Sequence, residues 1–352
     1  MRKLSLASLK NCCYVSYSFL LIFLYCCSYC EIGIPLHQST FLRVAFSKHH
    51  CNLKSILLES LSPKYMCLDN VNEKIIISRK SGTIQKSKDL PSRELFSTLL
   101  SVAANRRASM DMIFSLAKIR PAVLLIDLLP SISSNEIVDC IWCLGVLYSR
   151  LRESPISSFC STYDSEVFDV QKSHIRIAVT AIQVIHDRVT SGQDKILMSR
   201  SAAKLLYGLM KLRLTWRQLE SEDELVGITL PNLVLHSVPN MNSQGVSNAL
   251  YSLGKMQIPL RYSISNQQEQ KIKVAQLLVK ALLQQLHAVA SSKSFKGQVI
   301  SNSLWGMYSL GLRWSRFPTP VKSTLFSAIA RECVRMSPQS VGNTLYALGT
   351  YI

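Results

Sequence analysis

Between residue 91 and the end of the chain, apolar residues recur at helical spacing in several similar segments. The clearest are residues 247–254 (SNALYSLG), 301–307 (SNSLWGM) and 342–349 (GNTLYALG). Alignment on the aromatic residue of each brings three weaker segments into register, and the aligned aromatics are Phe114, Trp142, Tyr207, Tyr251, Trp305 and Tyr346. The residue before each aromatic is aliphatic, and the second residue after it is Leu or Met. Because these positions share one face at helical periodicity, each segment is predicted to be an amphipathic helix.

Capping residues support these helices. Asn242 and Ser337 each stand nine residues before an aromatic, and Ser133 does so with Glu136 three residues later, the pattern of a capping box. We expect each helix to span about four turns. A turn that often contains proline follows, and then a second apolar helix, seen clearly in residues 274–290.

The spacing of the aromatics predicts a repeat. It is 28, 65, 44, 54 and 41 residues, which fits a unit of about 40 residues with polar insertions, and the longest interval is expected to hold an insertion or a further copy. The residue after each aromatic is small, which lets a neighbouring helix approach closely: Ser115, Cys143, Gly208, Ser252, Gly306 and Ala347. Two-helix units of this size bury their apolar faces only by stacking. We therefore expect an all-α fold, an α-solenoid of degenerate two-helix repeats.

The first 90 residues lack the repeat. They begin with a basic segment, and the stretch from Tyr14 to Cys30 has no charged residue, which is typical of a signal peptide and is also long enough for a membrane anchor. Residues 32–58 are basic, hydroxylated and free of acidic side chains, as transit peptides are. We expect a targeting segment at 1–58, a linker at 59–90 and a repeat array at 91–352 that is truncated at its C-terminus. A retained anchor and an incorrect start of the sequence are the alternatives.

Charge indicates a polyanionic partner. The chain has 40 Lys+Arg against 22 Asp+Glu, a net charge of +18, which favours nucleic acid or an anionic membrane surface. The 11 cysteines do not form a disulfide pattern, and Cys140 and Cys143 are expected to be buried thiols. No phosphate-binding loop, metalloprotease motif or nucleophile elbow occurs in the sequence. We therefore expect no enzymatic activity, cofactor or metal.

Two columns of the alignment carry polar side chains on the same helix face. Seven residues before the aromatics stand Arg107, Asn135, Arg200, Gln244, Gln298 and Gln339. Three residues before them stand Asp111, Asp139, Lys204, Asn248, Asn302 and Asn343. Amide and guanidinium groups match the edges of bases, and repeat proteins read single-stranded RNA with such pairs. The alternative is that the first column caps helices and the second bridges them. Basic residues near the turns are expected to meet phosphates: Lys211, Arg213, Lys255, Arg261, Lys296 and Arg313.

The segments SNALYSLGKM, SNSLWGMYSLGLRW and GNTLYALG resemble the octotricopeptide and heptatricopeptide repeat proteins, and the helical region of the related FAST-kinase-domain proteins. The resemblance covers residues 200–352 and, more weakly, 105–200. It implies import into a plastid or mitochondrion and binding of organellar RNA, with effects on RNA stability, processing, splicing or translation. Many members carry a C-terminal RAP domain, which this sequence does not show, so the resemblance gives no support for RNA cleavage.

Three functions are therefore open at this point. The first is an organellar protein that binds single-stranded RNA, alone or with other proteins of an RNA-processing complex. The second is a protein-binding scaffold of the HEAT or armadillo kind, which an exposed apolar groove favours. The third is a scaffold tethered to a membrane by the segment from Tyr14 to Cys30.

Overall fold

The computed structural model of the chain describes residues 92–105, 107–153, 164–194, 197–260, 266–292, 294–312, 314 and 317–349. The elements in this part are α-helices and short 3-10 helices, and no strand occurs among the described residues. The predicted all-α class is therefore confirmed for them. The expected targeting segment and linker lie outside the described residues.

The α-helices follow one another along the chain with short connections. They are α3 (Ser92–Ala104), α4 (Met110–Lys118), α5 (Pro121–Ile126), α6 (Ser134–Glu153), α7 (Asp164–Thr190), α8 (Ser199–Lys211), α9 (Trp216–Glu222), α10 (Val226–Leu235), α11 (Ser243–Met256), α12 (Asn266–Ala290), α13 (Gly297–Ser309), α14 (Thr319–Glu332) and α15 (Pro338–Gly349). The helices that carry the aligned aromatics are α4, α6, α8, α11, α13 and α15. Most of them have 12 to 14 residues, but α4 has 9 and α6 has 20.

The predicted caps form. The Asn242 side chain accepts a hydrogen bond of 2.8 Å from the Gly245 amide at the start of α11. The Ser133 amide and hydroxyl donate to the Glu136 carboxylate at 2.8 and 2.7 Å. These hydrogen bonds lower the pKa of Glu136, first through the hydroxyl and then through the amide. Each cap satisfies amides that the first turn of the helix leaves without partners.

The chain folds into two compact units. The larger one contains the described residues of 68–290 together with 306–312, and the smaller one contains 291–305 and 313–352 as far as they are described.

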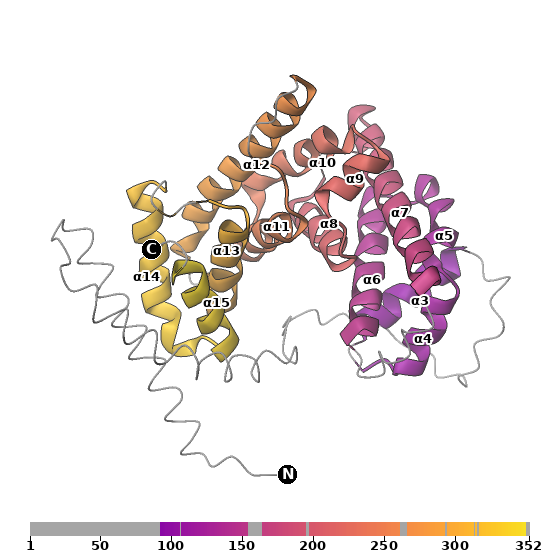
Figure 1. Cartoon of the computed structure of the whole chain (residues 1–352), viewed down its shortest axis with the longest axis horizontal. Helices are drawn as coiled ribbons and strands as arrows, with labels where there is room; N and C mark the ends of the chain where they lie inside the picture. The colour runs from indigo at the N-terminus through magenta and orange to yellow at the C-terminus, as the bar shows by residue number, and fades with distance from the viewer. Residues whose placement is uncertain are drawn as a thin grey trace, which may run out of the picture. The chain divides into compact units, whose positions relative to one another are not determined.

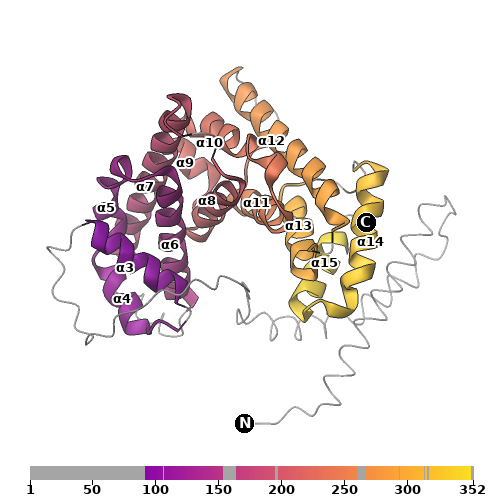
Figure 2. The ribbon, with the colours of Figure 1, turned by 180° about the vertical axis from the view of Figure 1, so that it is seen from behind.

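The helices of the larger unit form two layers. In the first layer α6 packs against α8, α8 packs against α11, and α3 and α4 both contact α6. In the second layer α7 contacts α5, α9 and α10, and α10 contacts α12. Figures 1 and 2 show α8 between α6 and α11. The two layers enclose an apolar core in which Ile141, Leu206 and Leu250, the residues before three of the aromatics, are 0% exposed.

Glycines let the first-layer helices approach to backbone contact. A Cβ atom on Gly208 of α8 would lie 3.0 Å from the Trp142 backbone of α6. One on Gly306 would lie 2.5 Å from the Leu250 carbonyl carbon of α11. In both cases the glycine after one aromatic faces the backbone at the aligned position of an earlier helix. The expectation that small residues at this position permit close packing is therefore confirmed for these two pairs of helices.

The 65-residue interval between Trp142 and Tyr207 contains long helices. It spans the rest of α6, the 27-residue α7 and the start of α8. Within its described residues no further copy of the aromatic helix is found, which favours an insertion.

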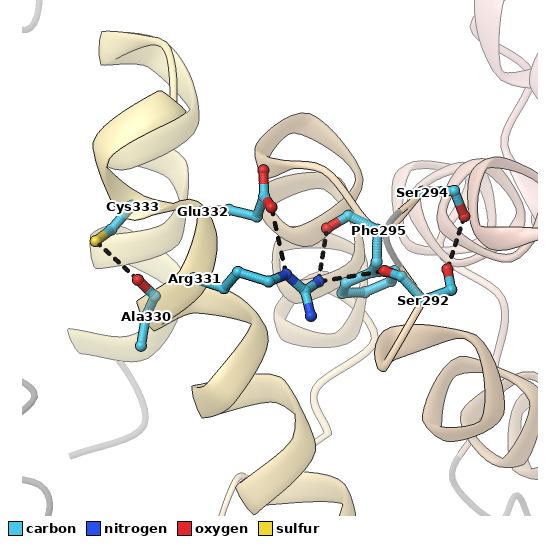
Figure 3. Close-up of polar contacts among 7 residues, drawn as sticks. All are labelled: Ser292, Ser294, Phe295, Ala330, Arg331, Glu332 and Cys333. Carbon is cyan, nitrogen blue, oxygen red and sulfur yellow. Dashed lines mark hydrogen bonds and ion pairs between the residues drawn. The ribbon is translucent and has the colours of Figure 1, made fainter.

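In the smaller unit, an arginine ties the end of α14 to the segment before α13. Arg331 donates to the carbonyl oxygens of Ser292 and Phe295, at 3.3 Å each, and to the Glu332 carboxylate at 3.3 Å (Figure 3). Phe295 is 0% exposed and Glu332 is 6% exposed. A buried carboxylate requires such a partner, so Arg331 holds both the carboxylate and the preceding loop in place.

Candidate nucleic-acid interface

The predicted polar columns lie on three adjacent helices of the larger unit. Asn135, Arg200 and Gln244 occupy the first turns of α6, α8 and α11, and Lys204 and Asn248 follow one turn later. Because α8 packs between α6 and α11, these side chains form a polar strip across one layer. Arg107 differs, because it lies in the turn before α4 and shares no helical face with Asp111.

Several members of this strip bond to neighbouring polar side chains. The Ser201 hydroxyl donates to the Asn135 side chain at 2.7 Å, which joins α8 to α6. The Lys204 ammonium lies 2.5 Å from the Asp139 carboxylate, also across α8 and α6. On α11 the Gln244 amide donates to the Asn248 side chain at 2.8 Å. The column three residues before the aromatics thus bridges two helices at one point, as expected if its role is structural.

The Asp139–Lys204 pair is partly buried. Its side chains are 35% and 26% exposed, so solvent still screens the ion pair and limits its contribution to stability. The same ammonium lies 4.3 Å from the centre of the Trp142 ring, within range of a cation–π contact. Lys204 is therefore a half-exposed cation between an aromatic ring and a carboxylate.

Two further aromatics of the alignment also have a lysine ammonium near the ring. Lys211 lies 5.7 Å from the centre of the Tyr207 ring, and Lys255 lies 5.9 Å from that of Tyr251. Both tyrosines are partly exposed, in contrast to the fully buried leucine that precedes each. Partial burial raises the pKa of Tyr251 and lowers that of Lys255. Three aromatic side chains and three lysines thus recur along α6, α8 and α11.

In the sequence these aromatics mark the repeat and do not stand out as part of a site. The signal for their pairing with lysine is the spacing of four residues from Tyr207 to Lys211 and from Tyr251 to Lys255, one helical turn along the same face. Of the other basic residues expected near phosphates, Lys296 is exposed in the smaller unit, whereas Arg261 and Arg313 lie outside the described residues.

Part of the positive charge is used within the fold. Arg150 donates to the carbonyl oxygens of Val102 and Asn105, both at 2.9 Å, at the end of α3. Arg152 donates to the Lys211 carbonyl at the end of α8. Such contacts satisfy carbonyls that the last turn of a helix leaves without partners. These two arginines therefore hold helix ends and are poor candidates for phosphate contacts.

The predicted site residues of the smaller unit differ in exposure. Gln298 and Asn302 lie on α13, and Asn302 is only 6% exposed. Gln339 and Asn343 lie on α15, where Gln339 is exposed and Asn343 is partly exposed. On the same helix the aligned aromatic, Tyr346, is 57% exposed. Access to a ligand is thus better on α15 than at Asn302.

The described residues hold no group of three or more side chains that could bind a metal ion. Cys140 and Cys143 are free thiols, both buried on α6, and burial raises the pKa of Cys140 to about 12. A thiol with so high a pKa is a poor nucleophile. No described helix has both the length and the apolar character that crossing a membrane requires. The apolar segment from Tyr14 to Cys30 lies outside this part of the chain.

Comparison with known proteins gives no match: no family model fits the chain, and no curated protein and no solved structure is significantly similar to it.

Proposed function

We propose that this chain is a helical-repeat protein that binds single-stranded RNA in a plastid or mitochondrion. In this proposal the aromatic helices and their partners form an α-solenoid with a unit of about 40 residues. The protein has no catalytic activity or cofactor of its own. It affects the stability, processing or translation of the bound RNA, alone or with other proteins of an RNA-processing complex.

The observation that carries the proposal is the polar strip on α6, α8 and α11. Arg200, Gln244 and Asn248 stand at aligned positions on adjacent helices, at half-buried or exposed sites. A ligand that follows the layer from helix to helix would meet one such set per helix. An extended single strand has this geometry, because its bases recur at a fixed interval and their edges accept and donate hydrogen bonds.

Charge supports the same choice of partner. The net charge of +18 favours a polyanion, and Lys204, Lys211 and Lys255 place ammonium groups along the strip. Lys211 also lies 3.2 Å from the Ser149 hydroxyl, which ties it to α6. Phosphate contacts from these lysines would hold a strand on the layer without reading its sequence.

One observation favours the second candidate, a protein-binding scaffold of the HEAT or armadillo kind. The Asp139–Lys204 and Ser201–Asn135 contacts join α6 to α8, so part of the polar strip serves the packing of helices. In that case the polar columns are structural, and binding takes place elsewhere on the layers.

Equilibrium binding of the full chain to a fluorescent, unstructured RNA oligonucleotide tests the proposal. Affinity is measured between about 50 and 200 mM salt, the range over which phosphate contacts weaken steeply. We expect Lys255→Gln to weaken binding and to reduce the salt slope by about 0.7, the value for one phosphate contact on a single strand. Lys280→Gln is the matched control, because Lys280 is exposed on the second-layer helix α12 and should change neither quantity.

Absence of RNA binding by the unmodified chain, or equal effects of the two lysine substitutions, would contradict the proposal. Equal effects would mean that net charge alone holds the RNA. The scaffold function would then become the leading hypothesis.

A further inference from the structure

We propose that Trp142, Tyr207 and Tyr251 are stacking platforms for the bases of an unpaired strand, and that the lysines over their rings move to its phosphates on binding. This inference rests on the proposed function and deepens it. It commits the site to single-stranded RNA and adds contacts with base faces, which depend little on sequence, to the base-edge contacts of the polar strip.

The three rings recur at one position on adjacent helices. The Gly208 backbone, next to Tyr207, meets the Trp142 backbone of α6 at such close range that a Cβ would lie 3.0 Å away. Helix α8 packs against both α6 and α11, so Tyr207 lies on the helix between those that carry Trp142 and Tyr251. The aromatic positions of α6, α8 and α11 therefore follow one another as neighbours across the layer.

Packing alone does not explain aromatic residues at this position. The preceding side chains Ile141, Leu206 and Leu250 are 0% exposed, and so are Leu144, Leu209 and Leu253 two residues after the aromatics. These aliphatic residues form the core contact of each helix. The aromatics lie beside them and stay partly exposed, so part of each ring lies outside this core contact. A flat ring at a half-exposed site offers what an aliphatic side chain lacks, a π-face for a base.

The lysines show that the rings attract cations and are reachable by them. Ammonium groups lie 4.3, 5.7 and 5.9 Å from the ring centres of Trp142, Tyr207 and Tyr251. At such partly exposed sites the stacking of a base contributes at least as much as the cation–π contact of an ammonium with the same ring. A base would therefore displace the ammonium from the ring, and the long lysine side chain would reach a phosphate of the same nucleotide. Aromatic rings interleaved with lysines are the arrangement that binds single strands in other proteins.

A single strand is the required form of the ligand. In a duplex the bases are paired and stacked on one another, so their faces are not available to protein rings. A layer of helices with one ring each would take one base per helix, as in other repeat proteins that bind RNA.

The test compares tyrosine variants of the full chain in the same binding assay. Tyr207→Leu and Tyr251→Leu, made singly, remove the π-face and keep an apolar side chain, whereas Tyr207→Phe and Tyr251→Phe keep the ring. Stacking predicts that each Leu variant binds an unstructured RNA about 5- to 100-fold more weakly, with an unchanged salt slope. The Phe variants should stay within about 2-fold of the unmodified chain, and a duplex of equal length should bind more weakly than the single strand.

A second measurement does not depend on the folding of any variant. The unmodified chain is titrated with RNA oligonucleotides in which several adjacent bases are replaced by abasic sites, which leaves all the phosphates in place. Stacking predicts a loss of affinity that increases with the number of bases removed.

The outcomes separate the two proposals. If the unmodified chain binds no RNA, the proposed function fails. If it binds RNA but the Leu variants match the Phe variants, the stacking inference is overturned and the proposed function stands. If abasic RNA binds as tightly as intact RNA, stacking and the base-edge contacts of the polar strip are both overturned, and only binding through phosphates remains.

Discussion

Replacement of Gly306 by alanine tests whether close helix packing depends on the small residue after each aromatic. In the larger unit a Cβ atom at this position would lie 2.5 Å from the carbonyl carbon of Leu250, 2.6 Å from its oxygen and 2.7 Å from the Tyr251 nitrogen. All three are backbone atoms of α11, so no change of side-chain rotamer relieves the overlap. The two helices must move apart or bend.

The size of the effect follows from two opposing contributions. Forcing extra atoms into a packed core costs about 1–3 kcal/mol and occasionally more. Alanine in place of glycine inside a helix regains about 1 kcal/mol. Because the overlap involves only backbone, we place the packing cost at the upper end and expect a net loss of about 2 kcal/mol of unfolding free energy. For a unit of this size that corresponds to a fall in melting temperature of about 4–8 °C.

Thermal unfolding followed by circular dichroism measures this change, and two other glycines serve as references. Gly245→Ala is the control, because its Cβ would meet nothing closer than 3.4 Å, an ordinary contact, and should leave the melting temperature unchanged or raise it. Gly208→Ala should fall between them, since its nearest contacts are 3.0 Å. A Gly306→Ala protein as stable as the unmodified one would refute the reasoning, because α11 and α13 would then have room that the structure denies.

Three further predictions concern single side chains. His174 is 3% exposed, and burial, followed by the charge of Arg152, lowers its pKa from 6.5 to about 4. As the pH falls, His174 is therefore protonated in the unfolded chain before it is protonated in the folded chain. The free energy of unfolding should be constant above pH 6.5 with respect to this group and should fall by about 3 kcal/mol as the pH drops to 4. His174→Phe should flatten this dependence in denaturant titrations at each pH. Arg331→Met should cost about 1–3 kcal/mol in melting experiments because it leaves the Glu332 carboxylate buried without its ion-pair partner, and adding Glu332→Gln should restore part of the loss. Ser133→Ala should cost about 1 kcal/mol in the same assay, because it removes the hydroxyl that donates to the Glu136 carboxylate and accepts from the Glu136 amide at the start of α6.

The features of the fold that could be predicted from the sequence depend on residues that are close together in the chain. Asn242 and its target amide on Gly245 are three residues apart, so the cap of α11 is visible in the sequence. The same holds for the capping box of Thr215 and Gln218 at the start of α9, which are also three residues apart. Helix periodicity is equally local, and it located the aromatic helices correctly.

The contacts between helices could not be predicted from the sequence, because they depend on how neighbouring helices are aligned along one another. Asp139 and Lys204 are 65 residues apart, and their ion pair exists only because α6 and α8 cross at Trp142 and Gly208. The column seven residues before the aromatics lies on the first turns of its helices, except at Arg107, which precedes the short helix α4. The contacts between lysines and aromatic rings could not be predicted from the sequence. They depend on the rings being partly exposed while the leucines beside them are buried, and the sequence does not distinguish the two.

RNA binding in the cell is the central claim, and ultraviolet crosslinking and immunoprecipitation of the tagged full chain from an organelle-enriched extract tests it most directly. Sequencing of the recovered RNA should give a sharp footprint on an organellar transcript, of about one nucleotide per repeat. The footprint should weaken when Gln244 or Lys255 is replaced. Recovery of no more RNA than a charge-matched control protein would contradict the account. The polar strip would then be structural, and the protein-binding scaffold would become the leading hypothesis.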